Sequence, residues 1–370
     1  MSHHPGRLRR LCRTLAVLAL TAAVGAPGTV ALADSPHRPG SLRPWVKSCV
    51  RHRGPEGLVN CLRKHGRPGA PQALRTPTID EFETTTADSA PIGITAGPDD
   101  ALWFTENSAN AVGRVTTSGT FTEYSVPTTG SGPAGITAGP DGALWFTEAS
   151  ADKIGRITTG GTITEYTLPT SGAYPWGITV GPDGALWFTE PGADNIGRIT
   201  TGGTITEYAL PTSGAYPLSI TAGSDGDLWF TEVLSGSIGQ ITTGGTVTEH
   251  TIPAQDSLPI GITAGPDDAL WFTDAGAAQI GQVTTGGTFT GYDLTDPVFP
   301  FPWGITAGPD GALWFTETYG NDIGQITTTG TISEVSIPTS DASPLEITTG
   351  SDDNLWYTEN AVSQIGRVTP

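Results

Sequence analysis

Histidine, cysteine and positive charge are scarce in this sequence, and these scarcities exclude several classes of function. The 370 residues include six histidines, and only His250 lies beyond position 65. No Ser-His-Asp set, phosphate-binding loop or zinc-ligand spacing is present. His250 takes a position that tyrosine holds in other copies of the repeat described below, so we expect it to be structural. The common hydrolase, nucleotide-binding and zinc-site patterns are therefore excluded.

Positive charge is concentrated in the first 75 residues. From position 76 onward, five Lys and Arg residues face 35 Asp and Glu residues, whereas positions 34–75 hold nine basic residues and two acidic ones. Such an acidic body argues against nucleic acid as its partner and favours cations or cationic surfaces. We expect the basic segment to contact an anionic polymer of the cell envelope or the acidic body itself.

Long apolar runs are absent after the N-terminus. Residues 15–24 form an apolar run that follows four arginines, and Ala-Leu-Ala at residues 31–33 ends this region. This layout predicts a signal peptide over residues 1–33, cleaved before Asp34. The run is too short to span a membrane and no later run replaces it, so we expect a secreted protein without a transmembrane segment.

Cysteine occurs three times. Cys12 falls in the signal peptide, which leaves Cys49 and Cys61 as a predicted disulfide in an exported protein. Residues 41–66 around this pair are expected to form two short helices. The sequence is therefore divided into a signal peptide (1–33), a basic cysteine-containing segment with its linker (34–75) and one large domain (76–370).

The large domain is built from a 42-residue repeat, in a chain rich in glycine (50) and proline (30). Each unit reads P-x-G-I-T-A-G-P-D-G-A-L-W-F-T-E, a variable stretch, and then I-G-R/Q-I-T-T-G-G-T-I-T-E-Y. One step has 43 residues, and the repeated tryptophans are Trp103, Trp145, Trp187, Trp229, Trp271, Trp314 and Trp356. The apolar runs are short and are separated by turn sequences, which favours strands over helices.

Each unit is expected to form a four-stranded antiparallel meander. In the second unit the strands should cover residues 135–138, 143–148, 154–158 and 162–168, with a Gly160-Gly161 hairpin before the last strand. Seven such units predict an all-β, seven-bladed β-propeller. The last unit lacks a fourth strand, and residues 78–83 (TIDEFE) match the fourth strand of the second unit (TITEYT). We expect this N-terminal strand to complete the last blade and close the ring.

The acid that ends each W-F-T-E sequence is a candidate ligand. Pairing of the first two strands across the Gly-Pro-Asp-Gly turn sets Ala138 opposite Ala143 and hence Pro133 opposite Glu148, at the face whose loops vary most between units. These seven carboxylates are expected to share a rim and to raise each other's pKa values. Backbone capping or solubility is the alternative reason for the repeated acid. The set comprises Glu106, Glu148, Glu190, Glu232, Asp274, Glu317 and Glu359.

Glu346 departs from the repeat, because most units have glycine at this position. The same pairing places it opposite Tyr357 and diagonal to Glu359, close enough for two carboxylates to share a cation. An unpaired surface acid is the alternative.

Aromatic residues vary between units just before that glycine. Trp176 and Trp303, with Tyr174 nearby, are candidates for an aromatic wall that binds a ring-bearing small molecule or a glycan. Packing of these loops against neighbouring blades is the alternative.

The repeated frame, followed by I-G-R-I-T, resembles the virginiamycin B lyase (streptogramin lyase) family over residues 76–370. The resemblance implies a propeller that opens cyclic depsipeptides of the streptogramin B type by Mg-assisted elimination. In that family a histidine base occupies the x position of P-x-G-I, between a glutamate two residues earlier and a W-F-T-E glutamate, both of which bind the metal. A second histidine, one blade earlier, binds the substrate.

Only one of these four functional residues is present in this sequence. Glu359 matches a metal ligand, whereas the base falls on Leu345, the second ligand on Ser343 and the substrate histidine on Trp303. Leucine cannot accept a proton, so we assign no catalytic residue.

Three functions remain open. We expect a monomeric, secreted ligand-binding module whose site includes Trp176, Trp303, Tyr174, Glu317, Glu346 and Glu359. The first alternative is a divergent lyase in which Glu346 and Glu359 bind Mg, and the second is a purely structural role in the cell envelope.

Overall fold

The computed structural model describes residues 77–294 and 300–370. The predicted signal peptide, the basic segment and the predicted Cys49–Cys61 disulfide lie outside these residues. Among the described residues, no helix is both long enough and apolar enough to cross a membrane.

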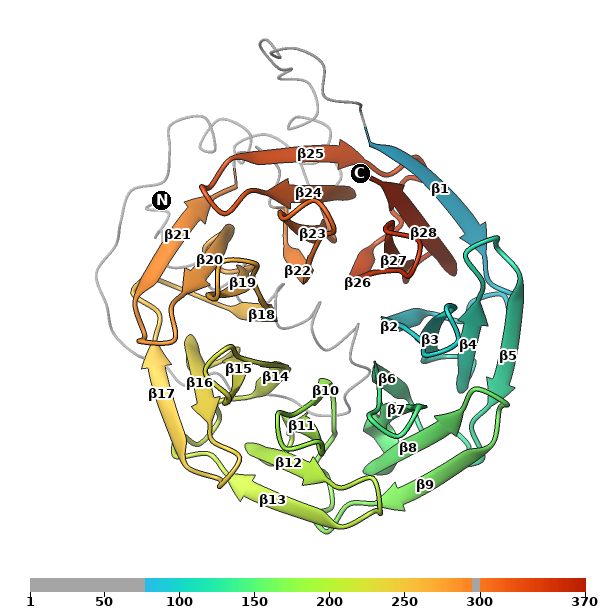
Figure 1. Cartoon of the computed structure of the whole chain (residues 1–370), viewed down its shortest axis with the longest axis horizontal. Coiled ribbons are helices and arrows are strands. Elements are labelled where there is room, and N and C mark those ends of the chain that lie inside the picture. The colour runs from blue at the N-terminus through green and yellow to red at the C-terminus, as the bar shows by residue number, and fades with distance from the viewer. Residues whose placement is uncertain (1–76, 295–299) are drawn as a thin grey trace, which may run out of the picture. The chain divides into compact units, whose positions relative to one another are not determined.

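The described residues form seven four-stranded antiparallel sheets, which follow one another around a ring (Figure 1). Each innermost strand contacts the innermost strand of the next sheet, and β26 contacts β2 to complete the circle. The innermost strands are β2 (Pro91–Ala96), β6 (Pro133–Ala138), β10 (Ile178–Val180), β14 (Pro217–Ala222), β18 (Pro259–Ala264), β22 (Pro302–Ala307) and β26 (Pro344–Thr349). The predicted all-β, seven-bladed propeller is confirmed.

The second strand of each blade carries the buried L-W-F-T sequence. These strands are β3 (Leu102–Glu106), β7 (Ala143–Glu148), β11 (Leu186–Glu190), β15 (Leu228–Glu232), β19 (Leu270–Asp274), β23 (Leu313–Glu317) and β27 (Leu355–Glu359). The third strands are β4 (Ala111–Val115), β8 (Lys153–Thr158), β12 (Asn195–Ile199), β16 (Ser237–Ile241), β20 (Gln279–Val283), β24 (Asp322–Ile326) and β28 (Gln364–Thr369). The outer strands are β5 (Phe121–Ser125), β9 (Ile163–Thr167), β13 (Ile205–Ala209), β17 (Val247–Thr251), β21 (Phe289–Asp293), β25 (Ile332–Ser336) and β1 (Thr78–Glu83). A single 3-10 turn, η1 (Ala149–Ala151), is present among the described residues.

The strands of the second unit agree with their predicted positions to within two residues. The turn before β7 has Gly142 at φ 72°, and the hairpin before β9 has Gly161 at φ 88°. Glycine tolerates these left-handed conformations, which L side chains rarely adopt. The turn sequences therefore set the lengths of the strands.

The N-terminal strand closes the ring as predicted. β1 pairs antiparallel with β28, from Thr78 opposite Thr369 to Glu83 opposite Gln364. Phe82 stacks on Trp356 with 5.5 Å between ring centroids. The last blade is therefore built from both ends of the described chain.

The repeated tryptophans form the core between blades and are at most 1% exposed. Each indole Nε1 donates a hydrogen bond of 2.9–3.2 Å to the aspartate of the preceding turn, as Trp145 does to Asp141. In six of the seven blades an outer-strand aromatic ring stacks on the same indole, at 5.6 Å for Tyr166 and Trp145, whereas the sixth blade has Val335 at this position. His250 stacks on Trp229 at 5.3 Å, which confirms its place in the tyrosine position. The turn aspartates therefore hold the core tryptophans.

A ring of buried threonines links the blades. Thr147 Oγ1 accepts a 2.9 Å hydrogen bond from the Gly135 amide of its own blade and donates a 2.8 Å bond to the Trp176 carbonyl of the next. All seven W-F-T or W-Y-T threonines make the inter-blade bond, at 2.5–2.8 Å, and Thr358 bonds to the Ile92 carbonyl to close the circle. These bonds satisfy backbone groups that an innermost strand leaves open.

Candidate functional site

Six of the seven innermost strands contain an irregularity in their pairing with the second strand of the blade. In β26, Pro344 pairs with Glu359 and Ile347 pairs with Tyr357, so the register shifts by one residue between them. The same shift occurs in β2, β6, β14, β18 and β22. Such a bulge bends the strand and changes the direction of its side chains. The expectation that Glu346 lies opposite Tyr357 is therefore wrong, because Tyr357 faces Ile347.

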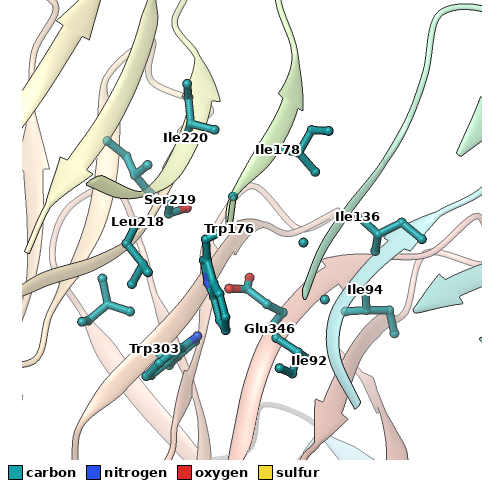
Figure 2. A pocket seen from close by; sticks show the side chains of 15 residues that line it. Ile92, Ile94, Ile136, Trp176, Ile178, Leu218, Ser219, Ile220, Trp303 and Glu346 are labelled. Carbon is teal, nitrogen blue, oxygen red and sulfur yellow. The ribbon is translucent and has the colours of Figure 1, made fainter. Parts of the chain in front are cut away.

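A cavity of about 150 Å³ lies among the innermost strands (Figure 2). Among the described residues that line it, the side chains are apolar apart from those of Ser219, Glu346 and two tryptophans, and Glu346 is the only charged one. The lining comprises Ile92, Gly93, Ile94, Gly135, Ile136, Trp176, Gly177, Ile178, Leu218, Ser219, Ile220, Ile260, Ile262, Trp303 and Glu346. An apolar cavity with a few polar groups is the usual form of a small-molecule site.

Glu346 points into this cavity beside Trp176 and Trp303 (Figure 2). Burial disfavours its charged form and raises the pKa to about 7, although a hydrogen bond from the Trp303 indole partly offsets this effect. The side chain nevertheless keeps an intermediate solvent exposure. Near neutral pH the cavity therefore contains a carboxyl group that gains or loses its proton easily.

Further aromatic rings support the two tryptophans of the cavity. Tyr174 stacks on Trp176 with 6.3 Å between ring centroids. On the other side, Phe301 lies 6.0 Å from Trp303 and 5.0 Å from Tyr319, which is 49% exposed. The rings thus extend from the cavity towards the surface. The structure brings Trp176, Trp303 and Glu346 together at one cavity, with Tyr174 behind Trp176.

The W-F-T-E acids do not form a solvent-facing rim. Glu317 and Glu359 are 0% exposed, as are the corresponding glutamates of the other blades, and Asp274 is 1% exposed. The loops on this face hydrogen-bond to each other over the acids, as Ser150 N does to Ser131 O at 2.9 Å beside Glu148. The expected rim is therefore wrong, and none of these acids lines the central cavity.

The pKa values of most of these acids are raised, but mutual repulsion is not the main cause. Burial is the largest contribution, and it raises the pKa of Glu148 to about 7 and that of Glu359 to about 8. The neighbouring charge is an outer-strand glutamate of the same blade, Glu165 for Glu148 and Glu81 for Glu359. The expectation that repulsion between blades raises these pKa values is therefore wrong, because the main cause is burial of each acid within its own blade.

The residues present do not fit the family's metal site. Leu345 occupies the base position and is 2% exposed, and the ligand position at Ser343 has no carboxylate. No group of three or more His, Cys, Asp or Glu side chains that could hold a metal is found in residues 77–294 and 300–370. Glu359 alone offers too few oxygen ligands for Mg²⁺.

The sequence interpretation overlooked Ser219. It lines the cavity at the position where Gly177 stands in the preceding blade and Gly261 in the following one. A comparison of this position across all seven units, rather than the search for acids alone, would have identified it.

Comparison with known proteins agrees with this architecture. A sequence model of the virginiamycin B lyase family matches residues 77–300 and 298–370. The virginiamycin B lyase from Staphylococcus aureus is 42% identical, and the match covers 80% of this chain and 100% of that chain with a TM-score of 0.76. A streptogramin B lyase is 41% identical, with 81% and 99% of the chains covered and a TM-score of 0.78.

A catalytically inactive variant of the Staphylococcus aureus lyase has been solved with quinupristin. It is 42% identical to this chain, and the match covers 80% of this chain and 100% of that chain with a TM-score of 0.76. The matches cover almost all of the described residues. This chain belongs to the virginiamycin B lyase family.

Proposed function

We propose that this chain is a ligand-binding propeller that has lost the elimination activity associated with its family's name. The replacement of the base by Leu345 carries the proposal. A leucine side chain has no group that accepts a proton, and Leu345 is buried, at 2% exposure.

The central cavity supports a binding role. Its volume of about 150 Å³ is similar to that of an apolar protein cavity that holds a single benzene ring. The ligand is therefore one ring, or a ring-bearing group that belongs to a larger molecule such as a glycoside. Trp176 and Trp303 supply aromatic surface for such a group.

The proposal extends to the cellular setting. A signal peptide over residues 1–33 would export the chain, and the basic segment at 34–75 would contact an anionic polymer of the envelope. The propeller would act as a monomer, because β1 closes the ring and leaves no unpaired strand in the last blade.

The first test is an activity assay. Purified full-length protein is incubated with a streptogramin B and Mg²⁺, and ring opening is followed by mass spectrometry beside the Staphylococcus aureus lyase. We expect no ring opening by this chain. Mg²⁺-dependent turnover that disappears in Glu359→Gln would instead establish the divergent lyase.

The second test is binding. Benzyl alcohol is expected to raise the melting temperature of the wild-type protein, because a ligand that binds only the folded state stabilises it. Trp176→Ala should abolish this shift, whereas Tyr319→Ala, on the surface, should retain it. If benzyl alcohol does not change the melting temperature and the protein does not open streptogramin B, the structural role applies instead.

A further inference from the structure

We infer that the central cavity selects organic cations, and that the carboxylate of Glu346 together with the indole rings of Trp176 and Trp303 recognises a small alkyl- or arylammonium group. This inference rests on the binding function proposed above and names the class of ligand. It is carried by the position of one charged side chain among the otherwise uncharged described residues of the cavity lining.

The first step of the argument is the isolation of the charge. Among the described residues, Glu346 is the only charged one in the lining, and no described lysine, arginine or histidine lines the cavity with it. An ionised carboxylate in an apolar environment is costly unless a positive charge compensates it. The Trp303 indole donates one hydrogen bond but carries no charge. The described lining therefore supplies the anionic partner of an ion pair, and a cationic ligand would supply the other.

The second step is the origin of the acid. Gly93, Gly135, Gly177, Gly261 and Gly304 hold the corresponding position in five other blades. A Cβ atom at Gly304 would lie 2.5 Å from the Leu345 carbonyl oxygen, so this position favours glycine on steric grounds. Glu346 is thus not needed for the repeat. Its carboxylate is a local addition to the cavity.

The third step distinguishes an organic cation from a metal ion. Within the part of the chain that the structure describes, Ser219 supplies the only other side-chain oxygen of the lining. Two oxygen-bearing side chains are too few for Mg²⁺ or Ca²⁺, which require about six or more oxygen ligands. Aromatic faces, in contrast, attract organic cations through cation–π interactions, and tryptophan is the most effective ring. The two indoles beside one carboxylate match an ammonium group.

The fourth step is the field of the surrounding protein. The sequence from position 76 onward carries 35 acidic and five basic residues. A strongly negative protein raises the local concentration of cations and repels anions. The field and the cavity therefore favour the same class of ligand.

The test compares two probes of similar shape and different charge. Binding of benzylammonium and of benzyl alcohol to the full-length protein is measured by calorimetry at about pH 8, where Glu346 is largely ionised. We expect benzylammonium to bind at least about tenfold more tightly than benzyl alcohol. Glu346→Gln should make the two affinities nearly equal. Glu346→Gly, which restores the glycine of the other blades, should do the same.

The outcomes separate this inference from the proposed function. Equal affinities in the wild type, or a preference that persists in Glu346→Gln, would overturn the cation inference and leave the binding function standing. Binding of neither probe would overturn both. Mg²⁺ alone serves as a control, and a melting shift by Mg²⁺ that depends on Glu346 would replace the organic cation by a metal ion and overturn the inference.

Discussion

At the scale of the residue, the same amino acid has two distinct environments in this propeller. The W-F-T-E glutamates lie within the blades, 0% exposed, and each pKa shift that is resolved has burial as its largest cause. Glu346 instead lines the central cavity and keeps an intermediate exposure. A glutamate that faces a cavity can pair with a ligand, whereas one enclosed by its own blade mainly affects stability. Glu346 is therefore the residue on which the binding specificity depends.

Glu346→Gln is expected to stabilise the protein in a pH-dependent way. Burial raises the folded-state pKa of Glu346 to about 7 from its ordinary value of 4.5, so its contribution to stability is complete below pH 4.5 and is lost as the pH rises through 7. Glutamine does not ionise, so the variant does not lose stability at this position as the pH rises. The difference in unfolding free energy should be near zero at pH 4.5 and roughly 1–2 kcal/mol in favour of the variant at pH 8, after allowance for partial exposure.

Urea unfolding of both proteins between these two pH values measures the difference. Ser219→Ala is the matched control, because it changes an uncharged side chain in the same cavity and should show no pH-dependent effect. A difference between Glu346→Gln and the wild type that stays constant with pH would contradict the prediction.

Residue comparison within the repeat singled out three residues that line the cavity, but it did not predict the burial of the acids. Trp176, Trp303 and Glu346 stand out because they replace the usual residue at a shared position. The pairing of Pro133 with Glu148 was also correct. Pairing does not report which loops cover a side chain, and the contacts between Ser131 and Ser150 that cover Glu148 join two different connections.

At the scale of the element, the observed register of the innermost strands differs from the predicted one by one residue beyond the bulge. The turn sequence predicts Ala138 opposite Ala143, whereas Ala138 pairs with Leu144. Strand boundaries were predictable because glycine and proline mark them locally. The bulge was not, since it depends on contacts with the next blade, where Trp176 O accepts the Thr147 hydroxyl.

Thr147→Val is expected to destabilise the propeller by roughly 2–4 kcal/mol, because it leaves a buried amide and a buried carbonyl without their hydroxyl partner. Valine has nearly the same shape, so the loss reports hydrogen bonds rather than packing. Thr164→Val on the exposed side of β9 is the matched control and should change the unfolding free energy by less than about 0.5 kcal/mol. Similar losses in both variants, measured by urea unfolding, would argue against the threonine ring as a stabilising element.

At the scale of the whole molecule, two sets of acids oppose each other in their dependence on pH. Burial raises the pKa values of Glu106, Glu148, Glu190, Glu232 and Glu359 to about 7 or 8. Burial acts in the same direction on the turn aspartates, but hydrogen bonds from the tryptophans and their neighbours outweigh it and lower the pKa values of Asp99, Asp141, Asp183 and Asp352. The repeat multiplies each effect around the ring.

The unfolding free energy is therefore expected to be highest near about pH 4.5. Stability from the raised glutamates is complete below their unfolded pKa of 4.5 and is lost as the pH rises through 7 to 8. Stability from the aspartates is present above their unfolded pKa of 3.8 and is lost as the pH falls below it. Thermal unfolding between about pH 3 and 9 measures the profile.

Glu190→Gln should reduce the fall in stability between about pH 5 and 8, since it removes one of the buried acids. Glu83→Gln, at an exposed position of β1, is a control that removes the same charge without touching the buried set. A melting temperature that rises steadily towards pH 8 in the wild type would contradict the assignment of these pKa shifts.

Closure by β1 has a consequence for the order in which the protein is made. The ion pair between Asp80 and Arg367 joins residues 287 positions apart, and β28 ends at Thr369, immediately before the C-terminus. Six blades consist of strands that follow one another along the chain, so each can form while the ribosome is still adding residues. The seventh requires the earliest strand of the propeller to remain available until the latest has emerged. Completion of the ring is thus a late step that waits for β28, and a translation product truncated before β28 would be left as an open chain of blades.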